Sequence, residues 1–138
     1  MDELERLELV EELLDEIREH AESGALIIVE GRRDRNTLNR LGIDGEILLA
    51  THMPLLDLVD GIALEQREVV MLTDWDRGGN ELAARISRHL RAQGIMPNVE
   101  LRGRLRTLVQ KKVKDVEGLY TYIMNQRLML RGVDVMWS

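Results

Sequence analysis

The sequence predicts an α/β fold, with a parallel sheet of four strands between helices. Apolar runs of four or five residues alternate along the chain with segments of helical periodicity, which is the pattern of doubly wound sheets. These runs are apolar throughout rather than at every second position, as expected for strands buried on both faces. At 138 residues the chain has the size of one domain with a core of its own.

Residues 1–24 predict an amphipathic helix that precedes the sheet. Its apolar residues recur at intervals of three and four: Leu4, Leu7, Val10, Leu13, Leu14 and Ile17. Ser23-Gly24 is a typical helix end. Residues 1–22 hold ten acids and two arginines, a net charge of −8 in a chain whose total is −6. We expect this acidic helix to pack on the domain formed by residues 25–138; a dimer-forming arm is the alternative.

From residue 25 onward, strands and helices are expected in alternation, ending in a C-terminal helical extension. The expected strands cover residues 25–29, 46–50, 69–72 and 97–101. The expected helices cover residues 34–41, 80–93 and 115–128, and residues 54–62 are expected to form a short helix or a turn. Gly42 and Gly94 follow two of these helices as end signals. In a strand order of 2-1-3-4, the first and third strands are neighbours.

Composition excludes several classes of protein. Cysteine is absent, so the chain has neither a disulfide framework nor a thiolate metal site. No apolar run is long enough to span a bilayer, and the acidic N-terminus argues against a signal peptide, so we expect a cytoplasmic protein without a membrane partner.

The residues after Glu22 carry a net charge of +2, and part of that charge is concentrated. No acid occurs before Asp115 among six cations, which are Arg102, Arg104, Arg106, Lys111, Lys112 and Lys114. This concentration permits a nucleic-acid partner. A solvated basic face is the alternative interpretation.

Two apolar runs end in acid and glycine. The run 69–72 leads into Thr73-Asp74-Trp75-Asp76-Arg77-Gly78-Gly79, and the run 26–29 leads into Glu30-Gly31. Ligands of open α/β sheets bind outside the carboxyl ends of the strands, so these acids converge if the two strands are neighbours. Oxygen ligands alone suit Mg²⁺, or Mn²⁺ in its place. The glycines and the helix that follows offer backbone N–H groups to a phosphate.

The segments Val29-Glu30-Gly31-x-x-Asp34 and Thr73-Asp74-x-Asp76-Arg77-Gly78-Gly79 resemble the Toprim domain. Type IA and type II topoisomerases, bacterial-type primases, ribosomal-RNA maturation nucleases, OLD-type nucleases and recombination-repair proteins share that domain. The resemblance covers residues 25 to about 101 and implies a Rossmann-like Toprim fold. The small size and the added helix are most similar to the small stand-alone archaeal Toprim proteins, which are related to the maturation nucleases.

The resemblance also implies roles for individual residues. Glu30 matches the family's general acid/base, which is sometimes a metal ligand, and Asp74 and Asp76 match its metal-binding pair, for one or two Mg²⁺ ions. Asp34 matches the acid that orients neighbouring catalytic groups; a simple helix cap is the alternative. Trp75 is expected to pack under its loop rather than stack on a base. Candidate contacts to nucleic acid are Arg32, Arg33, Arg77, Gly78, Gly79, Lys111, Lys112 and Lys114, with solvated surface as the alternative.

These features favour a Mg²⁺-dependent nuclease acting on structured RNA or DNA, in RNA processing or DNA repair. Tyr120 and Tyr122 are the only tyrosines and both fall on the last helix, so a water nucleophile is expected in place of a topoisomerase tyrosine. The first alternative is a non-catalytic, metal-binding module that associates with nucleic acid or the ribosome. The second is a receiver-like phosphoacceptor domain. A monomer or a small homo-oligomer is expected.

Overall fold

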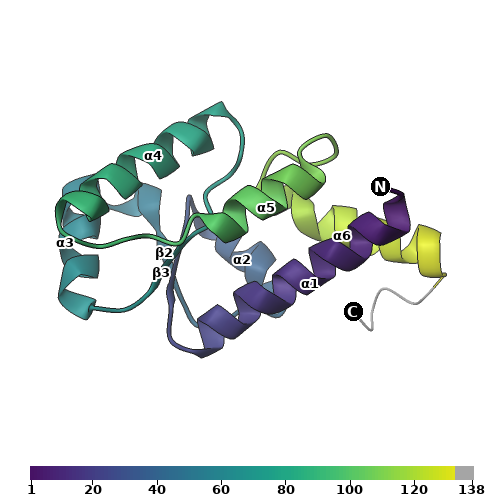
Figure 1. Cartoon of the computed structure of the whole chain (residues 1–138), viewed down its shortest axis with the longest axis horizontal. Coiled ribbons are helices and arrows are strands. Elements are labelled where there is room, and N and C mark those ends of the chain that lie inside the picture. The colour runs from purple at the N-terminus through teal and green to yellow at the C-terminus, as the bar shows by residue number, and fades with distance from the viewer. Residues whose placement is uncertain (133–138) are drawn as a thin grey trace.

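In the computed structural model, which describes residues 1–132, a parallel sheet lies between two layers of helices (Figure 1). The central strand β1 (Leu26–Val29) pairs with β2 (Glu46–Leu49) on one side and with β3 (Val69–Met71) on the other. Both pairs are parallel. Because β1 lies between the other two strands, the strand order is β2-β1-β3. The α/β class and the parallel sheet are therefore as predicted.

The helices divide between the two faces of the sheet. Helices α3 (Leu55–Glu65) and α4 (Arg77–Ala92) pack on one face, where they contact alternate residues of β1 and β3 (Figure 1). The opposite face is covered by four helices: α1 (Glu3–Glu22), α2 (Arg32–Arg40), α5 (Glu100–Val109) and α6 (Val116–Arg131). Because successive strand residues point to opposite faces, the continuous apolar runs feed both cores.

Helix α1 packs on the rest of the chain, as expected, and is not a free arm. Its apolar side includes Leu7, Val10, Leu13 and Ile17, all fully buried against α5 and α6. Asp2 caps the helix by accepting a hydrogen bond from the backbone N–H of Glu5 (2.8 Å). The boundary at residue 24 between this helix and a separate domain stays a prediction. Within residues 1–132, no helix is both long enough and apolar enough to cross a membrane.

The prediction of a fourth strand at 97–101 is wrong, and with it the order 2-1-3-4. Only Asn98 pairs with the sheet, through an isolated bridge to Val70. The chain enters α5 at Glu100, whose backbone N–H donates to the Asn98 side chain (3.1 Å). Leu101, Leu105 and Val109 recur at four-residue spacing and are buried together. This spacing is typical of a helix, and it decides the structure of the segment over the short apolar run that predicted a strand.

Two helices begin earlier than predicted, and both begin at the acidic strand exits. Helix α2 begins at Arg32 rather than at residue 34, and α4 begins at Arg77 rather than at residue 80. Asp76 is the N-cap of α4, and Gly31 is the N-cap of α2. The short helix η1 (Ala50–His52) joins β2 to α3. The candidate site thus lies directly between strand ends and helix starts.

Candidate functional site

The two acidic strand exits lie side by side, as the sequence predicts for neighbouring strands. In the parallel pairing of β1 with β3, Ile28 is opposite Met71. The pairing continues one residue further, because the N–H of Leu72 donates to the carbonyl of Ile28 (2.8 Å). Glu30 and the turn that holds Asp74 therefore leave the sheet at the same edge. We call this region, formed by Glu30, Asp34, Asp74, Asp76 and Asp115, the acidic edge.

Asp74 is held at this edge by the start of α6. Its Oδ1 accepts a hydrogen bond from the backbone N–H of Val116 (2.8 Å), the first residue of that helix. Burial raises the pKa of Asp74 to about 7, and the negative charges of Asp34, Glu30 and Asp115 act in the same direction, against the hydrogen bond from Val116. The carboxyl group therefore holds a proton up to near-neutral pH unless a cation approaches.

Glu30 has a carboxylate oxygen without a partner. Its Oε1 is buried and forms no hydrogen bond with any of the residues 1–132 that the structure describes. Burial raises the pKa of Glu30, and the charges of Asp76 and Asp34 add to that effect, whereas hydrogen bonding with Asp74 acts against it. A buried acceptor without a donor is costly, so a cation or a proton at this oxygen would stabilise the site.

Asp34 closes the turn that carries Glu30. It is the third residue of α2, and its Oδ2 accepts a hydrogen bond from the backbone N–H of Gly31 (3.0 Å). The side chain is buried, and burial raises its pKa, with further contributions from the charges of Glu117 and Asp115. The geometry gives Asp34 a capping contact; its catalytic role stays a prediction.

Gly79 sits where a side chain has no space. A Cβ at this position would lie 1.9 Å from the carbonyl oxygen of Asp74 and 2.8 Å from Oε1 of Glu30. The residue is also fixed by hydrogen bonds on both sides: its N–H donates to Oδ1 of Asp76 (2.7 Å), and its carbonyl accepts from the hydroxyl of Thr73 (3.0 Å). A Cβ at Gly78 would meet nothing nearer than 3.8 Å. Close approach at the acidic edge therefore requires glycine at 79 but not at 78.

Trp75 points into the protein, as expected, and not toward a base. The side chain is 5% exposed, and its Nε1–H donates to the carbonyl of Val113 (2.7 Å). Its backbone N–H donates to the carbonyl of Lys114 (3.3 Å). The residue between the two aspartates thus anchors their turn to the loop before α6.

Arg102 is a residue of the site that the sequence analysis assigned to a basic surface stretch. It is only 9% exposed, and its Nε donates to the carbonyl of Thr73 (2.8 Å). Its Nη2 donates to the carbonyl of Asp74 and to Oδ1 of Asn80 (2.6 Å). Arg102 follows Leu101 on the buried side of α5. The helical period of that segment could therefore have indicated that Arg102 is buried. The guanidinium group supports the turn from behind and places a positive charge near the acids.

Arg104 belongs to the predicted basic stretch, but its charge is paired within the protein. Its guanidinium forms an ion pair with Glu16 of α1, with a distance of 2.9 Å from Nη1 to Oε1. Of the six cations between 102 and 114, two are therefore committed to contacts within the protein. The other four, Arg106, Lys111, Lys112 and Lys114, are exposed.

The predicted arginines at the strand exits are also exposed. The Arg77 side chain is 94% exposed and forms an ion pair with Glu81 (3.2 Å). Arg33 is 3.8 Å from Glu117, and Arg32 is exposed beside it. These three cations lie at the starts of α2 and α4, next to the acidic edge. Their positions suit contact with a phosphate, which stays a prediction.

The acidic edge is suited to a hard cation, although it is not a closed cage. Within residues 1–132, no group of three His, Cys, Asp or Glu side chains is arranged so that it could hold a metal ion. The available donors are nevertheless all carboxylate oxygens, one of which is buried and unpartnered on Glu30. Mg²⁺ retains several waters and binds through one or two carboxylates plus substrate phosphate. The donor chemistry therefore suits Mg²⁺ bound partly through water, whereas the assignment of Glu30, Asp74 and Asp76 as its ligands stays a prediction.

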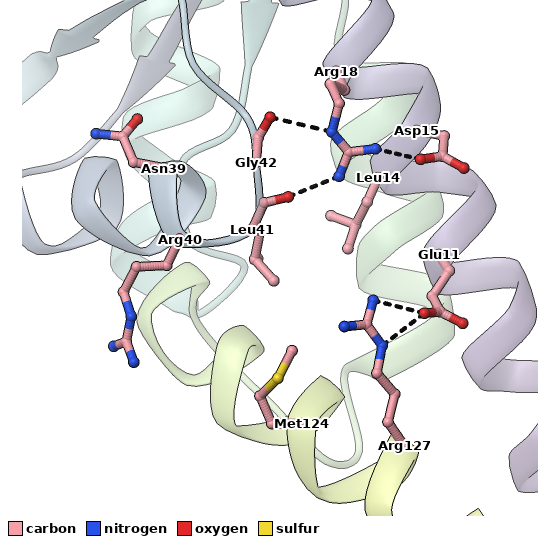
Figure 2. Close-up of a pocket in the computed structure, with 10 residues that line it drawn as sticks. All are labelled: Glu11, Leu14, Asp15, Arg18, Asn39, Arg40, Leu41, Gly42, Met124 and Arg127. Atoms are coloured by element: carbon pink, nitrogen blue, oxygen red, sulfur yellow. Dashed lines mark hydrogen bonds and ion pairs between the residues drawn. The ribbon is translucent and has the colours of Figure 1, made fainter. Parts of the chain in front are cut away.

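A separate cavity of about 320 Å³ lies among α1, the end of α2 and α6 (Figure 2). Two of its arginines form hydrogen bonds within the protein, although Nη1 of Arg127 is buried without a partner among the described residues. Arg18 donates to the carbonyls of Leu41 (2.7 Å) and Gly42 (3.1 Å), and Arg127 donates to Glu11 (2.8 Å). The hydrogen bonds around the cavity therefore connect α1 to the end of α2 and to α6.

Comparison with known proteins agrees with this geometry. Residues 25–108 match the Toprim domain. A UPF0292 protein of Methanosarcina barkeri is 50% identical over 123 residues, covering 89% of this chain and 86% of the relative. A UPF0292 protein of Pyrococcus abyssi is 39% identical over 116 residues, covering 84% and 85%. A solved structure, a putative protein from Aquifex aeolicus, is similar in fold, with a TM-score of 0.67 at 24% identity over 77% of this chain and 94% of that one.

Proposed function

The chain belongs to the Toprim domain family, and from this premise we propose that it is a Mg²⁺-dependent nuclease hydrolysing phosphodiesters of structured RNA or DNA. Family membership indicates a metal-dependent function connected with nucleic acids. The observation that carries the finer proposal is that Glu30, whose Oε1 lacks a partner, and the Asp74 turn lie at the same edge of the sheet.

In this proposal Glu30 has two tasks. Asp74 and Asp76, with Glu30, would hold the ion, which when bound would polarise the phosphodiester and stabilise its developing charge. Glu30 also accepts the proton of the attacking water, whose oxygen bonds to phosphorus as the bond to the leaving sugar oxygen breaks, and that sugar oxygen takes up a proton from solvent. The raised pKa of Glu30 supports this role, because a base is most effective when its pKa approaches the working pH. Asp34 positions Glu30 by holding the Gly31 N–H.

The starts of α2 and α4 would bind the phosphates. Arg32, Arg33 and Arg77 are exposed there and can reach phosphate oxygens. The first N–H groups of a helix lack partners within it, so those of Arg77 and Gly78 point toward the same region. Gly79 contributes by its lack of a side chain, which lets the Asp74 turn and Glu30 approach each other.

The surroundings of the two tyrosines favour water over a tyrosine hydroxyl as the nucleophile. Tyr122 is 8% exposed and its hydroxyl oxygen is buried, and burial raises its pKa. The ring of Tyr120 lies under the guanidinium of Arg40, at 3.9 Å from the ring centroid. Neither hydroxyl is presented to the acidic edge as a topoisomerase tyrosine would be. Hydrolysis is therefore favoured over strand passage.

The test is cleavage of a structured RNA and of a DNA duplex by the purified full chain, in Mg²⁺ and in EDTA. We expect Mg²⁺-dependent cleavage that Asp74→Asn abolishes. Asp44→Asn is the matched control, because Asp44 is exposed and precedes β2, at the opposite edge of the sheet. Absence of cleavage, or cleavage that survives Asp74→Asn, would contradict the proposal.

A non-catalytic, metal-binding module that associates with nucleic acid or the ribosome is the second candidate. It keeps the fold and the metal without turnover, and the small size of the chain favours it. This candidate predicts salt-dependent binding without turnover. It also predicts that Asp76→Asn changes binding only by the effect of one charge, whereas the nuclease proposal predicts the loss of cleavage.

A further inference from the structure

All three lysines of the chain lie in one short loop between α5 and α6. Lys111, Lys112 and Lys114 are exposed, and none forms an ion pair with an acid among residues 1–132. Arg104, in contrast, is neutralised by Glu16. The loop is therefore a concentrated positive charge without an internal partner in the described structure.

Two of these lysines line a groove along α6. The groove has a volume of about 500 Å³, and Lys112 and Lys114 stand at its start with Asp115. Gly118, Thr121, Asn125 and Met129 follow at intervals of three and four residues, so the groove runs along one face of the helix. At 1.5 Å per residue this face is about 16 Å long.

The groove begins at the acidic edge. Lys114 accepts a hydrogen bond from the N–H of Trp75 through its carbonyl (3.3 Å), and Val116 donates to Asp74 (2.8 Å). Asp115, the N-cap of α6, lines the groove itself. A chain bound along α6 would therefore continue into the site where the phosphodiester is cut.

We propose that this groove binds an unpaired strand of nucleic acid, an inference that rests on the proposed nuclease function. Lys112 and Lys114 are placed for backbone phosphates, whose negative charge the loop complements. The side chains of Thr121, Asn125 and Gln126 offer donors and acceptors to base edges. Single-stranded bases are splayed out and read in this way, whereas paired bases turn these edges to each other. The groove belongs to α6, outside the matched residues 25–108, so it is an addition to the family's domain.

The test measures binding of labelled single-stranded RNA and DNA oligonucleotides by fluorescence anisotropy in EDTA, where cleavage cannot occur. For the double variant Lys112→Ala/Lys114→Ala we expect affinity to fall about tenfold or more, with a salt slope reduced by about 1.4 for two lost phosphate contacts. The control, Arg85→Ala/Arg88→Ala, removes the same charge from exposed residues of α4, which lies across the molecule from α6 (Figure 1). We expect the control to change affinity by less than about twofold.

Photo-crosslinking of a strand that contains 4-thiouridine gives an independent measurement, and adducts are expected within residues 121–129. Equal losses in the two double variants, duplex binding as tight as strand binding, or adducts only outside the groove would each overturn the inference. Failure of the nuclease proposal has a different signature, because the strand then binds in EDTA through Lys112 and Lys114 but is not cut when Mg²⁺ is added. Cleavage that is indifferent to these lysines contradicts the groove assignment alone.

Discussion

The contrast between Gly79→Ala and Gly78→Ala tests the close packing at the acidic edge. Both glycines lie in the first turn of α4, so alanine at either position gains helix propensity of about 0.5–1 kcal/mol. At Gly78 the added methyl meets nothing nearer than 3.8 Å, so this gain remains. At Gly79 it meets the Asp74 carbonyl at 1.9 Å and Glu30 Oε1 at 2.8 Å, and the backbone must move. Overpacking of this kind costs about 1–3 kcal/mol.

Thermal unfolding followed by circular dichroism measures the difference between the two variants. With about 4 °C of Tm per kcal/mol for a chain of this size, Gly78→Ala should raise Tm by about 2–4 °C. The 1.9 Å approach to backbone puts Gly79→Ala at the upper overpacking cost, about 3 kcal/mol, and after subtraction of the same propensity gain its Tm should fall by about 8–10 °C. Mg²⁺ should raise the Tm of Gly78→Ala as much as that of wild type, and that of Gly79→Ala less, because Asp74 and Glu30 are displaced. Equal Tm values and equal Mg²⁺ responses in the two variants would refute this reasoning.

Three further predictions concern the turn and its supports. Because the folded-state pKa of Asp74 is about 7 against an ordinary 3.8, its contribution to stability is complete below pH 3.8 and is lost as the pH rises to 7. The interval from pH 5 to pH 7.5 covers most of this window. Between these two pH values in EDTA, Asp74→Asn should therefore lose less Tm than wild type, and equal losses would contradict the prediction. Arg102→Leu should lower the free energy of unfolding, measured in urea, by about 2–5 kcal/mol, because the buried carbonyls at the exit of β3 lose their donor. Arg104→Leu removes an exposed ion pair and should have a much smaller effect. The reverse ranking would be inconsistent with the structure. Trp75→Phe should cost about 1 kcal/mol through the lost Nε1–H donor, and an unchanged unfolding midpoint would show that this bond contributes nothing.

The sequence predicts the sheet edge well because the relevant signals are local. Apolar runs followed by Glu30-Gly31 and by the Asp74–Gly79 turn are visible without tertiary information, and topology then brings parallel strand ends together. The neighbouring positions of β1 and β3 confirm that argument. The packing role of Trp75 could also be predicted, since an indole in a tight turn at a buried strand tends to be covered.

The errors arise where tertiary contacts decide. Residues 97–101 form one bridge and then a helix, because Leu101 and Leu105 gain more from packing against α1 than a short edge strand would gain from pairing. Arg102 could not be separated from its neighbours by charge alone, since its burial depends on unpaired carbonyls that only the folded turn presents. The groove of α6 likewise depends on tertiary contacts, because the lysine loop at its start accepts a hydrogen bond from the backbone N–H of Trp75.

Anomalous diffraction from a crystal soaked in Mn²⁺ shows whether a divalent ion binds at the acidic edge. We expect an anomalous peak bounded by carboxylates of Glu30, Asp74 and Asp76, with metal–oxygen distances of about 2.1 Å. The same peak should be absent from crystals of Asp74→Asn and present in those of Asp44→Asn. A peak located away from these carboxylates, or no peak at all at saturating Mn²⁺, would contradict the account.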